Sequence, residues 1–576
     1  MIEVELADQP ENRASLHETL GRSYLSLRLF EEAEVQLKSA FDIRREIFGE
    51  RHPLFARSLH QMGLGNFFMG KEDLGLEYLY RAYELRRELL GEQHVDVAES
   101  LTTIADRERY QLGPAGTIPM YENALTILRK SPGEERRMAD ALHSYANMLV
   151  ESGWYEEAVP ILDETLGIRT QLLGPDHFEV ARTLKDLGEI YFNWADYDKA
   201  ESIYREQIRI FRSVFGENGS RDLAHALSDL AGVVRIKEDY AKAESFYQES
   251  IEMEYRTMGY SALALNDYGN FLYEQGRFAE ALPHSKTVYR LWFGDSEGAH
   301  QGKGYACQKL ANNLFELGHW DEAERLYGTA INNWRELYQE RHPRLARGLI
   351  GLGRVKQIKG DYDEAETLFR NALQVHSARL GERAPRTAMS MVYLGEILRI
   401  QGKADAEQFL VDGVNVLREE LGDQHSRVAW ALAQLAELKK DEGELDEAET
   451  MMLEALEIER QLPRESHPFL ADYLVGLAEI LMARGDAAGA EPLLREALSI
   501  RQHRYVEDDY RIAIGQSALG SCLFMLGHSE EAEPLLSAAH TTLQTKFGDQ
   551  HQVTQQAHDR LDVLNKRDDS ERPIDE

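Results

Sequence analysis

Cysteine is scarce in this chain of 576 residues, which holds only Cys307 and Cys522, far apart from each other. Two such cysteines exclude a disulfide framework and the usual zinc spacings, so we expect both thiols to be buried as small apolar groups in a reducing compartment. Long apolar runs are also missing, and no segment reaches the length of a membrane-spanning helix. The first residues, Met1 to Leu6, carry acidic side chains where a signal peptide needs basic ones. These absences favour a cytoplasmic protein.

Positive charge is in short supply, with 65 Lys and Arg against 100 Asp and Glu and a net charge of −35. A negative field of this size repels phosphate backbones, which disfavours nucleic acid as the main partner. Two explanations of the charge stay open. It forms a solvated outer surface that keeps a large protein soluble, or it attracts a protein partner with a basic segment.

An internal repeat dominates the sequence. Phrases built on Glu-Ala-Glu return along the chain, as in Glu32-Ala33-Glu34 and Glu447-Ala448-Glu449. The small central residue recurs about every 42 positions, at Ala33, Gly75, Thr117, Ala158, Ala200, Ala243, Ala281, Ala323, Ala365, Ala406, Ala448, Ala490 and Ala532. This regularity indicates thirteen copies of one structural unit, of which the copy centred on Thr117 departs most from the others.

Each unit has the pattern of two helices. In the fifth unit apolar and small residues stand three, four and seven positions apart, at Leu184, Leu187, Gly188, Tyr191, Tyr197, Ala200, Ile203, Tyr204 and Ile208. A Gly that ends the first helix in a left-handed conformation separates the two, as Gly360 does. Another small residue lies twelve positions before most centres, as at Gly188 and Gly520. Because Gly costs about 1 kcal/mol inside a helix, it predicts a close approach of two helix backbones.

The positions of these small residues resemble the tetratricopeptide repeat. The linker between units, as in Phe48-Gly49-Glu50-Arg51-His52-Pro53 and Leu421-Gly422-Asp423-Gln424-His425, is similar to the Leu-Gly-x-x-His-Pro linker of kinesin-light-chain-type repeats. The resemblance covers about residues 14–565. It implies an all-α fold, a right-handed superhelical solenoid of about thirteen helical hairpins, which binds other proteins along its concave side.

The linker histidines invite a metal hypothesis, which their spacing disfavours. His52, His94, His177 and His425 each lie about a whole repeat or more from the next one. We expect structural roles at the start of the following helix, where a Pro is also well placed. No cofactor and no metal site is predicted.

Two places break the repeat period. The spacing between Ala243 and Ala281 falls to 38, and the stretch from Gly294 to Gly304 is rich in Gly, so a change of curvature is expected near 255–305. The third unit loses its turn around Gly113. Either break is a hinge or neutral drift. The predicted organisation is an N-terminal segment, two parts of the repeat array, a capping helix that closes the solenoid and a disordered tail, at 1–13, 14–258, 259–550, 551–565 and 566–576.

The residue after the first small residue of each unit is expected to face the concave groove. It is Asn at Asn147, Asn270 and Asn312, and an Asn amide can bond to an extended peptide backbone. It is Glu at Glu396, Glu437 and Glu479, which favours Lys or Arg on a ligand, although Glu is also an ordinary solvated helix former.

Aromatic residues follow three positions later, at Phe192, Tyr273 and Phe315. They anchor apolar ligand side chains, or they pack between neighbouring helices. Arg182 and Lys185 stand one turn apart near Asn147, a fragment of the set with which some tetratricopeptide co-chaperones grip a C-terminal carboxylate. All eleven residues of these groups are candidate groove residues.

No catalytic motif is recognisable: there is no His-Glu-x-x-His, no Gly-x-Ser-x-Gly and no phosphate loop after a strand. The leading hypothesis is a non-catalytic scaffold or adaptor that binds a protein or an extended peptide, preferably basic, with no nucleic acid and no membrane insertion. The alternatives are a sensor that binds a small peptide or metabolite and changes curvature, and a regulatory arm for an effector on a separate chain.

Overall fold

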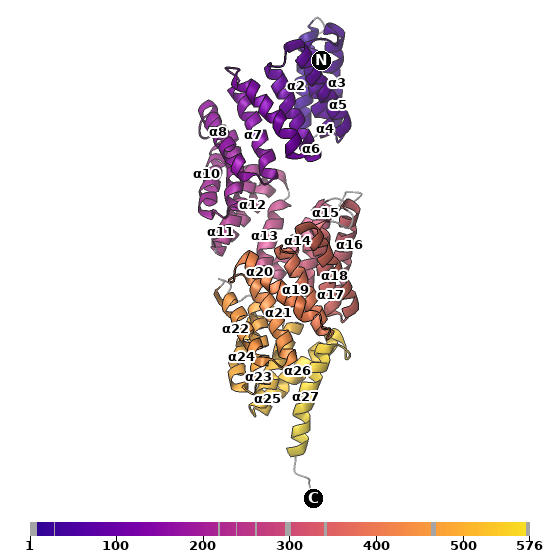
Figure 1. Ribbon diagram of the computed structural model, residues 1–576, viewed down its shortest axis with the longest axis vertical. Helices are drawn as coiled ribbons and strands as arrows, with labels where there is room; N and C mark the ends of the chain where they lie inside the picture. Colours follow the sequence, from indigo (N-terminus) through magenta and orange to yellow (C-terminus); the bar gives the residue numbers. More distant parts are fainter. Residues whose placement is uncertain are drawn as a thin grey trace. The chain divides into compact units, whose positions relative to one another are not determined.

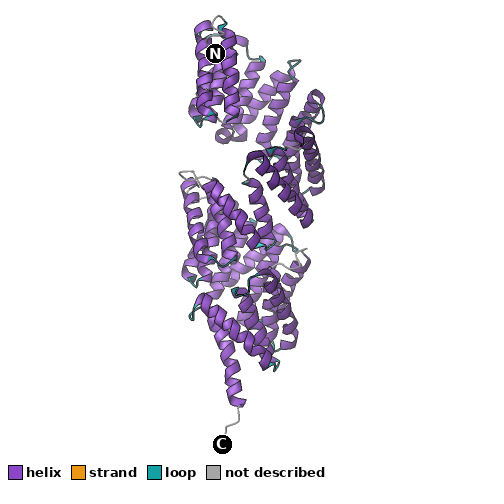
Figure 2. Ribbon diagram, turned by 180° about the vertical axis from the view of Figure 1, so that it is seen from behind, coloured by secondary structure: helices purple, strands orange, loops and turns teal. Residues whose placement is uncertain are grey.

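The computed structural model describes residues 9–27, 29–216, 219–237, 239–259, 262–293, 301–338, 342–461 and 468–571. Every regular element in these ranges is a helix, as Figure 2 shows. Consecutive helices pack against one another in pairs, and in both parts of the array first helices also contact the first helix of the next pair. The predicted all-α solenoid of helical hairpins is therefore confirmed.

The chain divides into two compact units, Met1–Gly259 and Tyr260–Glu576. In the first unit the helices, most of them labelled in Figure 1, are α2 (Pro10–Ser26), α3 (Phe30–Phe48), α4 (Pro53–Phe68), α5 (Glu72–Leu90), α6 (Val95–Arg129), α7 (Glu135–Glu151), α8 (Tyr155–Leu173), α9 (Phe178–Asn193), α10 (Tyr197–Phe215), α11 (Arg221–Ile236) and α12 (Tyr240–Met258).

The second unit continues with α13 (Leu263–Glu274), α14 (Phe278–Phe293), α15 (Gln301–Glu316), α16 (Trp320–Tyr338), α17 (Pro343–Ile358), α18 (Tyr362–Leu380), α19 (Pro385–Ile400), α20 (Ala406–Leu421), α21 (Ser426–Glu442), α22 (Leu445–Gln461), α23 (Pro468–Ala483), α24 (Ala487–Arg504), α25 (Tyr510–Met525), α26 (Ser529–Phe547) and α27 (Gln552–Glu571). The last helix ends at Glu571, six residues past the position expected for the end of the cap, and the division into cap and tail stays a prediction.

The small residues of the repeat are where two helices meet. The central small residue of each unit is buried. A Cβ added to Gly63 would lie 2.6 Å from Cγ of Leu79, and one added to Gly188 would lie 2.5 Å from the ring of Tyr204. Both neighbours belong to the second helix of the same hairpin. The close approach predicted from the sequence is thereby confirmed.

The linker histidines cap the helices that follow them. The Nδ1 atoms of His52, His94, His177, His342 and His425 accept the backbone N–H two residues further on, at 3.0 to 3.2 Å. In the linker before α25 the carboxylate of Asp509 takes the same role towards Arg511. This bond satisfies one of the unpaired donors of a helix N-terminus, so the structural role predicted for the linker histidines is confirmed.

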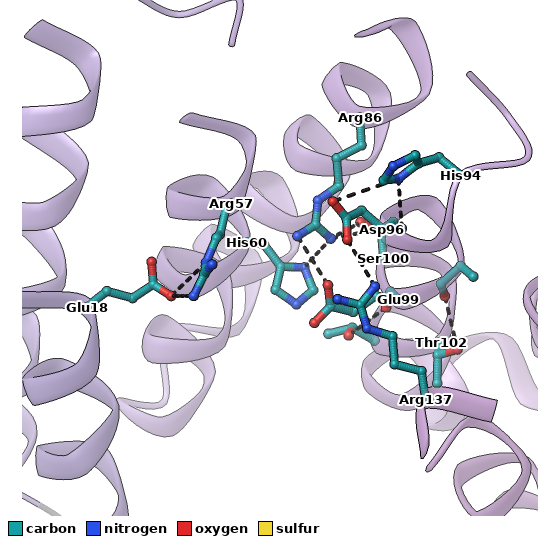
Figure 3. Close-up of polar contacts among 12 residues, drawn as sticks. Glu18, Arg57, His60, Arg86, His94, Asp96, Glu99, Ser100, Thr102 and Arg137 are labelled. Atoms are coloured by element: carbon teal, nitrogen blue, oxygen red, sulfur yellow. Dashed lines mark hydrogen bonds and ion pairs between the residues drawn. The ribbon is translucent and has the colours of Figure 1, made fainter. Parts of the chain in front are cut away.

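Buried arginines join successive repeats in the first unit. Arg44 donates to Glu18 at 2.5 Å and to Ser58 at 3.0 Å, and its side chain and that of Glu18 are almost fully buried. Arg86 holds the same position in the next repeat, because each arginine lies eleven residues after the central small residue of its unit. It donates to Ser100 at 2.8 Å (Figure 3). Each guanidinium therefore ties the second helix of one hairpin to the first helix of the next.

The two irregular places differ in form. In the third unit Gly113, with φ of 63°, joins two helical stretches inside α6 without a separate turn. Around the short linker, α13 has only 12 residues. Residues 260–261 and 294–300 lie outside the described part of the chain, so most of the Gly-rich stretch predicted to alter curvature is not covered.

Candidate ligand-binding cavity

The first helices of the second unit surround a cavity of about 620 Å³. Residues of α13, α15, α17, α19, α21, α23 and α25 line it, with single contributions from Phe278, Met452 and Tyr505. Because the first helix of each pair faces inward, this cavity lies on the concave side of the array. Its volume is in the usual range for sites that bind small molecules or short segments.

Contacts between residues far apart in sequence close the wall around the cavity. Arg511 in α25 donates to the backbone oxygen and to the carboxylate of Glu316 at the end of α15. Next to this pair, Trp320 packs against Tyr510 and Phe547, with ring centroids 5.4 and 5.1 Å away. His551 also contacts the backbone oxygen of Ile358 through Nε2, at 2.9 Å. The repeats of α15 to α18 therefore touch those of α25 to α27.

Four of the candidate residues come together in this cavity. Tyr273, Phe315, Glu396 and Glu437 all belong to its lining. Phe315 is buried beneath the guanidinium of Arg354, which lies 4.2 Å from the ring centroid. Its ring is thus partly occupied by the chain's own cation.

The glutamates of the row differ in their partners. Glu479 accepts from Lys440 at 3.0 Å and from Arg560 of α27 at 2.9 Å, and Glu437 accepts from Lys440 at 2.7 Å. Burial acts to raise the pKa of Glu479, but the two cations outweigh it and lower that pKa to about 2. Two of the three glutamates expected to attract basic side chains of a ligand, Glu437 and Glu479, therefore already pair with basic side chains of this chain.

Glu396 is the exception. It accepts a hydrogen bond of 2.6 Å from the uncharged amide of Gln357, and no ion pair of its carboxylate appears in the described ranges. Burial raises the pKa of this carboxyl group and outweighs the lowering effects of the Gln357 hydrogen bond and of the charges of Arg399 and Arg354. A carboxylate held by an amide in a cavity favours a ligand that brings a cation or a strong donor.

Aromatic rings stand beside Glu396. Tyr393 lies one turn before it on α19, and its ring centroid is 4.7 Å from that of Trp430 on α21. Both rings line the cavity and are only half-buried. Faces of Trp and Tyr attract cations as well as apolar groups, so rings and carboxylate favour the same kind of ligand.

The remaining candidates lie elsewhere. In the first unit Arg182 and Lys185 are exposed, Asn147 is half-buried, and Phe192 packs edge-on against Tyr197 of its own hairpin at 5.9 Å. Arg182 pairs with Glu179 at 3.5 Å. In the second unit Asn270 is half-buried, and Asn312 accepts a hydrogen bond of 2.7 Å from Tyr327. None of these six side chains lines the cavity, which has Tyr273, Phe315, Glu396 and Glu437 from the candidate set.

Sequence reasoning missed several lining residues. Tyr393 and Met389 precede Glu396 by three and seven positions, and Gln434 and Trp430 precede Glu437 in the same way. This i, i+4, i+7 spacing continues the inward face of one helix, so extending the groove position backwards by two turns finds them. No sequence pattern pointed to Arg511 as a lining residue, because its contact with Glu316 joins helices five repeats apart.

Other site types find little support in the described residues. No group of three or more His, Cys, Asp and Glu in those ranges is arranged to hold a metal ion. None of the helices there is both long and apolar enough to cross a bilayer. Cys307 and Cys522 are buried as predicted, and burial raises the pKa of each thiol to about 11, which makes both poor nucleophiles.

Family comparisons agree with the repeat. Models described as tetratricopeptide repeat match residues 18–54 and residues 137–213, 195–254 and 305–365. A model described as MalT-like TPR region matches residues 344–572. Among curated proteins, mouse nephrocystin-3 is 33% identical over 88 residues, which is 15% of this chain and 7% of that protein, and human nephrocystin-3 is 32% identical over 69 residues, 12% and 5%. The matches thus span a small fraction of these relatives.

Several solved structures align with this chain at TM-scores below 0.5. The APC/C hetero-tetramer Cut9–Hcn1 aligns over 97% of this chain and 98% of its own, at 13% identity and a TM-score of 0.46. A putative kinesin light chain of Podosopora anserina covers 35% of this chain and 97% of its own, at 21% identity and 0.29. The alignment with BtubC from P. vanneervenii covers 40% of this chain and 91% of its own, at 23% identity and a TM-score of 0.31. From the family models the chain is a tetratricopeptide repeat protein, and its recurring linker is similar to that of kinesin-light-chain-type repeats.

Proposed function

We propose that this protein is a non-catalytic interaction scaffold whose second unit receives a short segment of a partner protein in the cavity, with a Lys or Arg side chain directed at Glu396. The observation that carries the proposal is that, among the residues the structure describes, Glu396 is the lining carboxylate that has a hydrogen bond from an amide but no ion pair. Glu316 pairs with Arg354, Glu437 with Lys440 and Asp472 with Arg501.

The surroundings of Glu396 support a basic peptide segment. The rings of Tyr393 and Trp430 offer faces on which the aliphatic stem and the cation of the incoming side chain can rest. Arg427, an exposed residue of the lining, has no ion pair among the described residues and suits a backbone carbonyl or carboxylate of the same segment. The net charge of −35 adds long-range attraction for a basic partner. With its two buried thiols, we place the protein in the cytoplasm.

A selection of peptides on the immobilised full chain tests this proposal. Peptides enriched on the wild type should carry Lys or Arg next to an apolar residue. Glu396→Gln should weaken the best of them about 30-fold or more, the effect of leaving a buried cation without its partner. Trp430→Ala should weaken them as well.

Glu189→Gln is the matched control, because Glu189 holds the same repeat position in the first unit but is exposed. Its affinity should equal that of the wild type. If Glu396→Gln and Trp430→Ala enrich the same peptides with the same affinity as the wild type, the proposal is wrong.

A sensor is the second candidate function. Glu316, Tyr510 and Arg511 line the cavity, and the same residues form the contact that closes its wall. A ligand held against these residues would shift the equilibrium between closed and open walls by its preference for one of them. Hydrogen exchange in α16 and α25 to α27 should then slow when the selected peptide binds. Unchanged exchange would argue for a plain scaffold.

A further inference from the structure

Large apolar side chains are exposed to solvent along one edge of the first unit, where the turns between the two helices of each hairpin lie. Trp154 and Trp194, at the turns of two successive hairpins, are 43% and 42% exposed. Both line a groove of about 340 Å³ together with Gly153, Tyr155, Glu156 and Glu157. The ring of Trp194 packs edge-on against Tyr155 of the preceding hairpin, 6.4 Å between centroids, so the two turns are in contact.

Trp154 occupies a position that serves another purpose in other repeats. At the equivalent positions Asp196, Asp239 and Asp486 accept a backbone N–H of the helix that follows. Trp154 makes no such cap on α8. Losing a cap costs a helix about 1 kcal/mol, and exposing a Trp adds nothing to the core. An indole kept in the open at this cost favours a role in contact with another molecule.

The apolar row extends beyond the groove. Large apolar residues are also exposed near the ends of the first helical stretches of the three preceding units, at Leu27, Phe68 and Leu112, with exposures of 67%, 53% and 45%. At positions of the second unit equivalent to Trp194 the side chains are polar at Gln275, Lys359 and Arg484 and apolar but half-buried at Leu317, Ile400 and Leu526. Five successive repeats of the first unit carry an exposed large apolar side chain at this edge, whereas in the second unit Met525, 47% exposed, is a counterpart in the last repeat.

Charge indicates what covers this row. Glu156 and Glu157 border the groove, both are exposed, and neither takes part in an ion pair among the residues described. We infer that the turn edge of the first unit is a docking surface for a basic amphipathic helix of another protein. An apolar side chain of that helix lies between Trp154 and Trp194, and its Lys or Arg side chains face Glu156 and Glu157. This surface is independent of the cavity in the second unit.

Labelled model peptides and the full chain test the inference by fluorescence polarisation. The probes are an amphipathic helix of Leu and Lys, the same helix with every Lys replaced by Glu, and the same with every Leu replaced by Ser. The Leu/Lys helix should bind most tightly. Replacing both tryptophans, Trp154→Ala with Trp194→Ala, should weaken it at least tenfold, as expected for aromatic anchors.

Charge variants separate docking from unspecific attraction. Glu156→Gln with Glu157→Gln should weaken the Leu/Lys helix about threefold, in the range of exposed charge pairs. Glu447→Gln with Glu530→Gln makes the same charge change at turns of the second unit and should have no effect. Glu396→Gln should have none either, which keeps this test distinct from that of the cavity.

Trp154→Asp guards against loss of folding. It restores the capping carboxylate, so α8 should become more stable while the basic helix binds at least tenfold more weakly in spite of the added negative charge. Wild-type affinity in the double Trp variant would overturn the inference. An equal loss in the Glu447→Gln, Glu530→Gln control would also overturn it, because binding would then follow net charge alone.

Discussion

The indole of Trp320 stacks on the phenyl ring of Phe547, with planes 19° apart and centroids 5.1 Å apart, although 226 residues separate them along the chain. Tyr510 meets the same indole edge-on at 5.4 Å. Trp320 is 8% exposed, so its surface is largely covered by this cluster and its own hairpin. The wall of the cavity is thus closed by a small aromatic core as well as by the pair Glu316–Arg511.

Trp320→Ala should therefore open this closure. Removing a buried Trp costs roughly 3–5 kcal/mol, and the effect should be greatest where the cluster joins distant repeats. Denaturant unfolding should show the loss, and hydrogen exchange should become faster in α25 to α27. Trp154→Ala, which removes an exposed indole, should stay within about 0.5 kcal/mol of the wild type. A loss below about 1 kcal/mol in Trp320→Ala would mean that the cluster does not hold the wall together.

Arg44→Met should destabilise the first unit by roughly 3–5 kcal/mol, because it leaves the buried carboxylate of Glu18 with only Arg57 as a charged partner. Figure 3 shows the contact between the guanidinium of Arg57 and the carboxylate of Glu18. Apolar residues fill the position of Arg44 in other repeats, as at Leu417. Glu18→Met combined with Arg44→Met should thus recover most of the loss in urea unfolding. If the double variant is less stable than Arg44→Met alone, the buried charge is not the cause.

Ala195→Gly should stabilise the protein. Ala195 has φ of 59° in a turn where other repeats place Gly, as at Gly153 with φ of 79°. This conformation costs an L-residue about 1–2 kcal/mol, whereas Gly costs about 0.4–1 kcal/mol through the entropy of the unfolded chain. A net gain of about 0.5–1 kcal/mol in thermal or urea unfolding is expected. Gly153→Ala should lower stability, and a gain there would contradict the argument.

Acid should weaken the array through its buried histidines. Burial lowers the pKa of His376 to about 4. Its folded pKa is below the value of about 6.5 in the unfolded chain, so its contribution is complete above pH 6.5 and is lost as the pH falls towards 4. At pH 5 this one residue should have lost about 2 kcal/mol relative to pH 7.

The variant His376→Leu isolates this effect. Leu occupies the equivalent place in the next repeat at Leu417, and Ser390, the partner of His376, keeps its bond to the backbone oxygen of Arg386. Urea unfolding at pH 7, 6 and 5 should show a smaller loss of stability with falling pH than in the wild type. An identical pH dependence would assign the acid sensitivity to the other buried histidines, His60 and His143, whose pKa values burial lowers to about 3.

Part of the candidate site was accessible from the sequence. Glu396 and Glu437 were found because one inward position recurs with the repeat, and the same helical face carries Tyr393 and Trp430 three to seven residues earlier. Which of these glutamates is free for a ligand was not accessible. Lys440 lies close in sequence to Glu437, but Arg560 meets Glu479 from α27, two repeats further on.

The amino-acid sequence by itself determined the hairpins, their small residues at each close approach and the capped starts of their helices. These depend on contacts within one repeat or between neighbours, so a period of about 42 residues contains the information. The tertiary structure alone decided that Trp320 meets Phe547 and Arg511 meets Glu316, and hence that the groove of the second unit becomes a cavity with a continuous wall. Such contacts depend on small rotations summed over several repeats, and no local pattern encodes that sum.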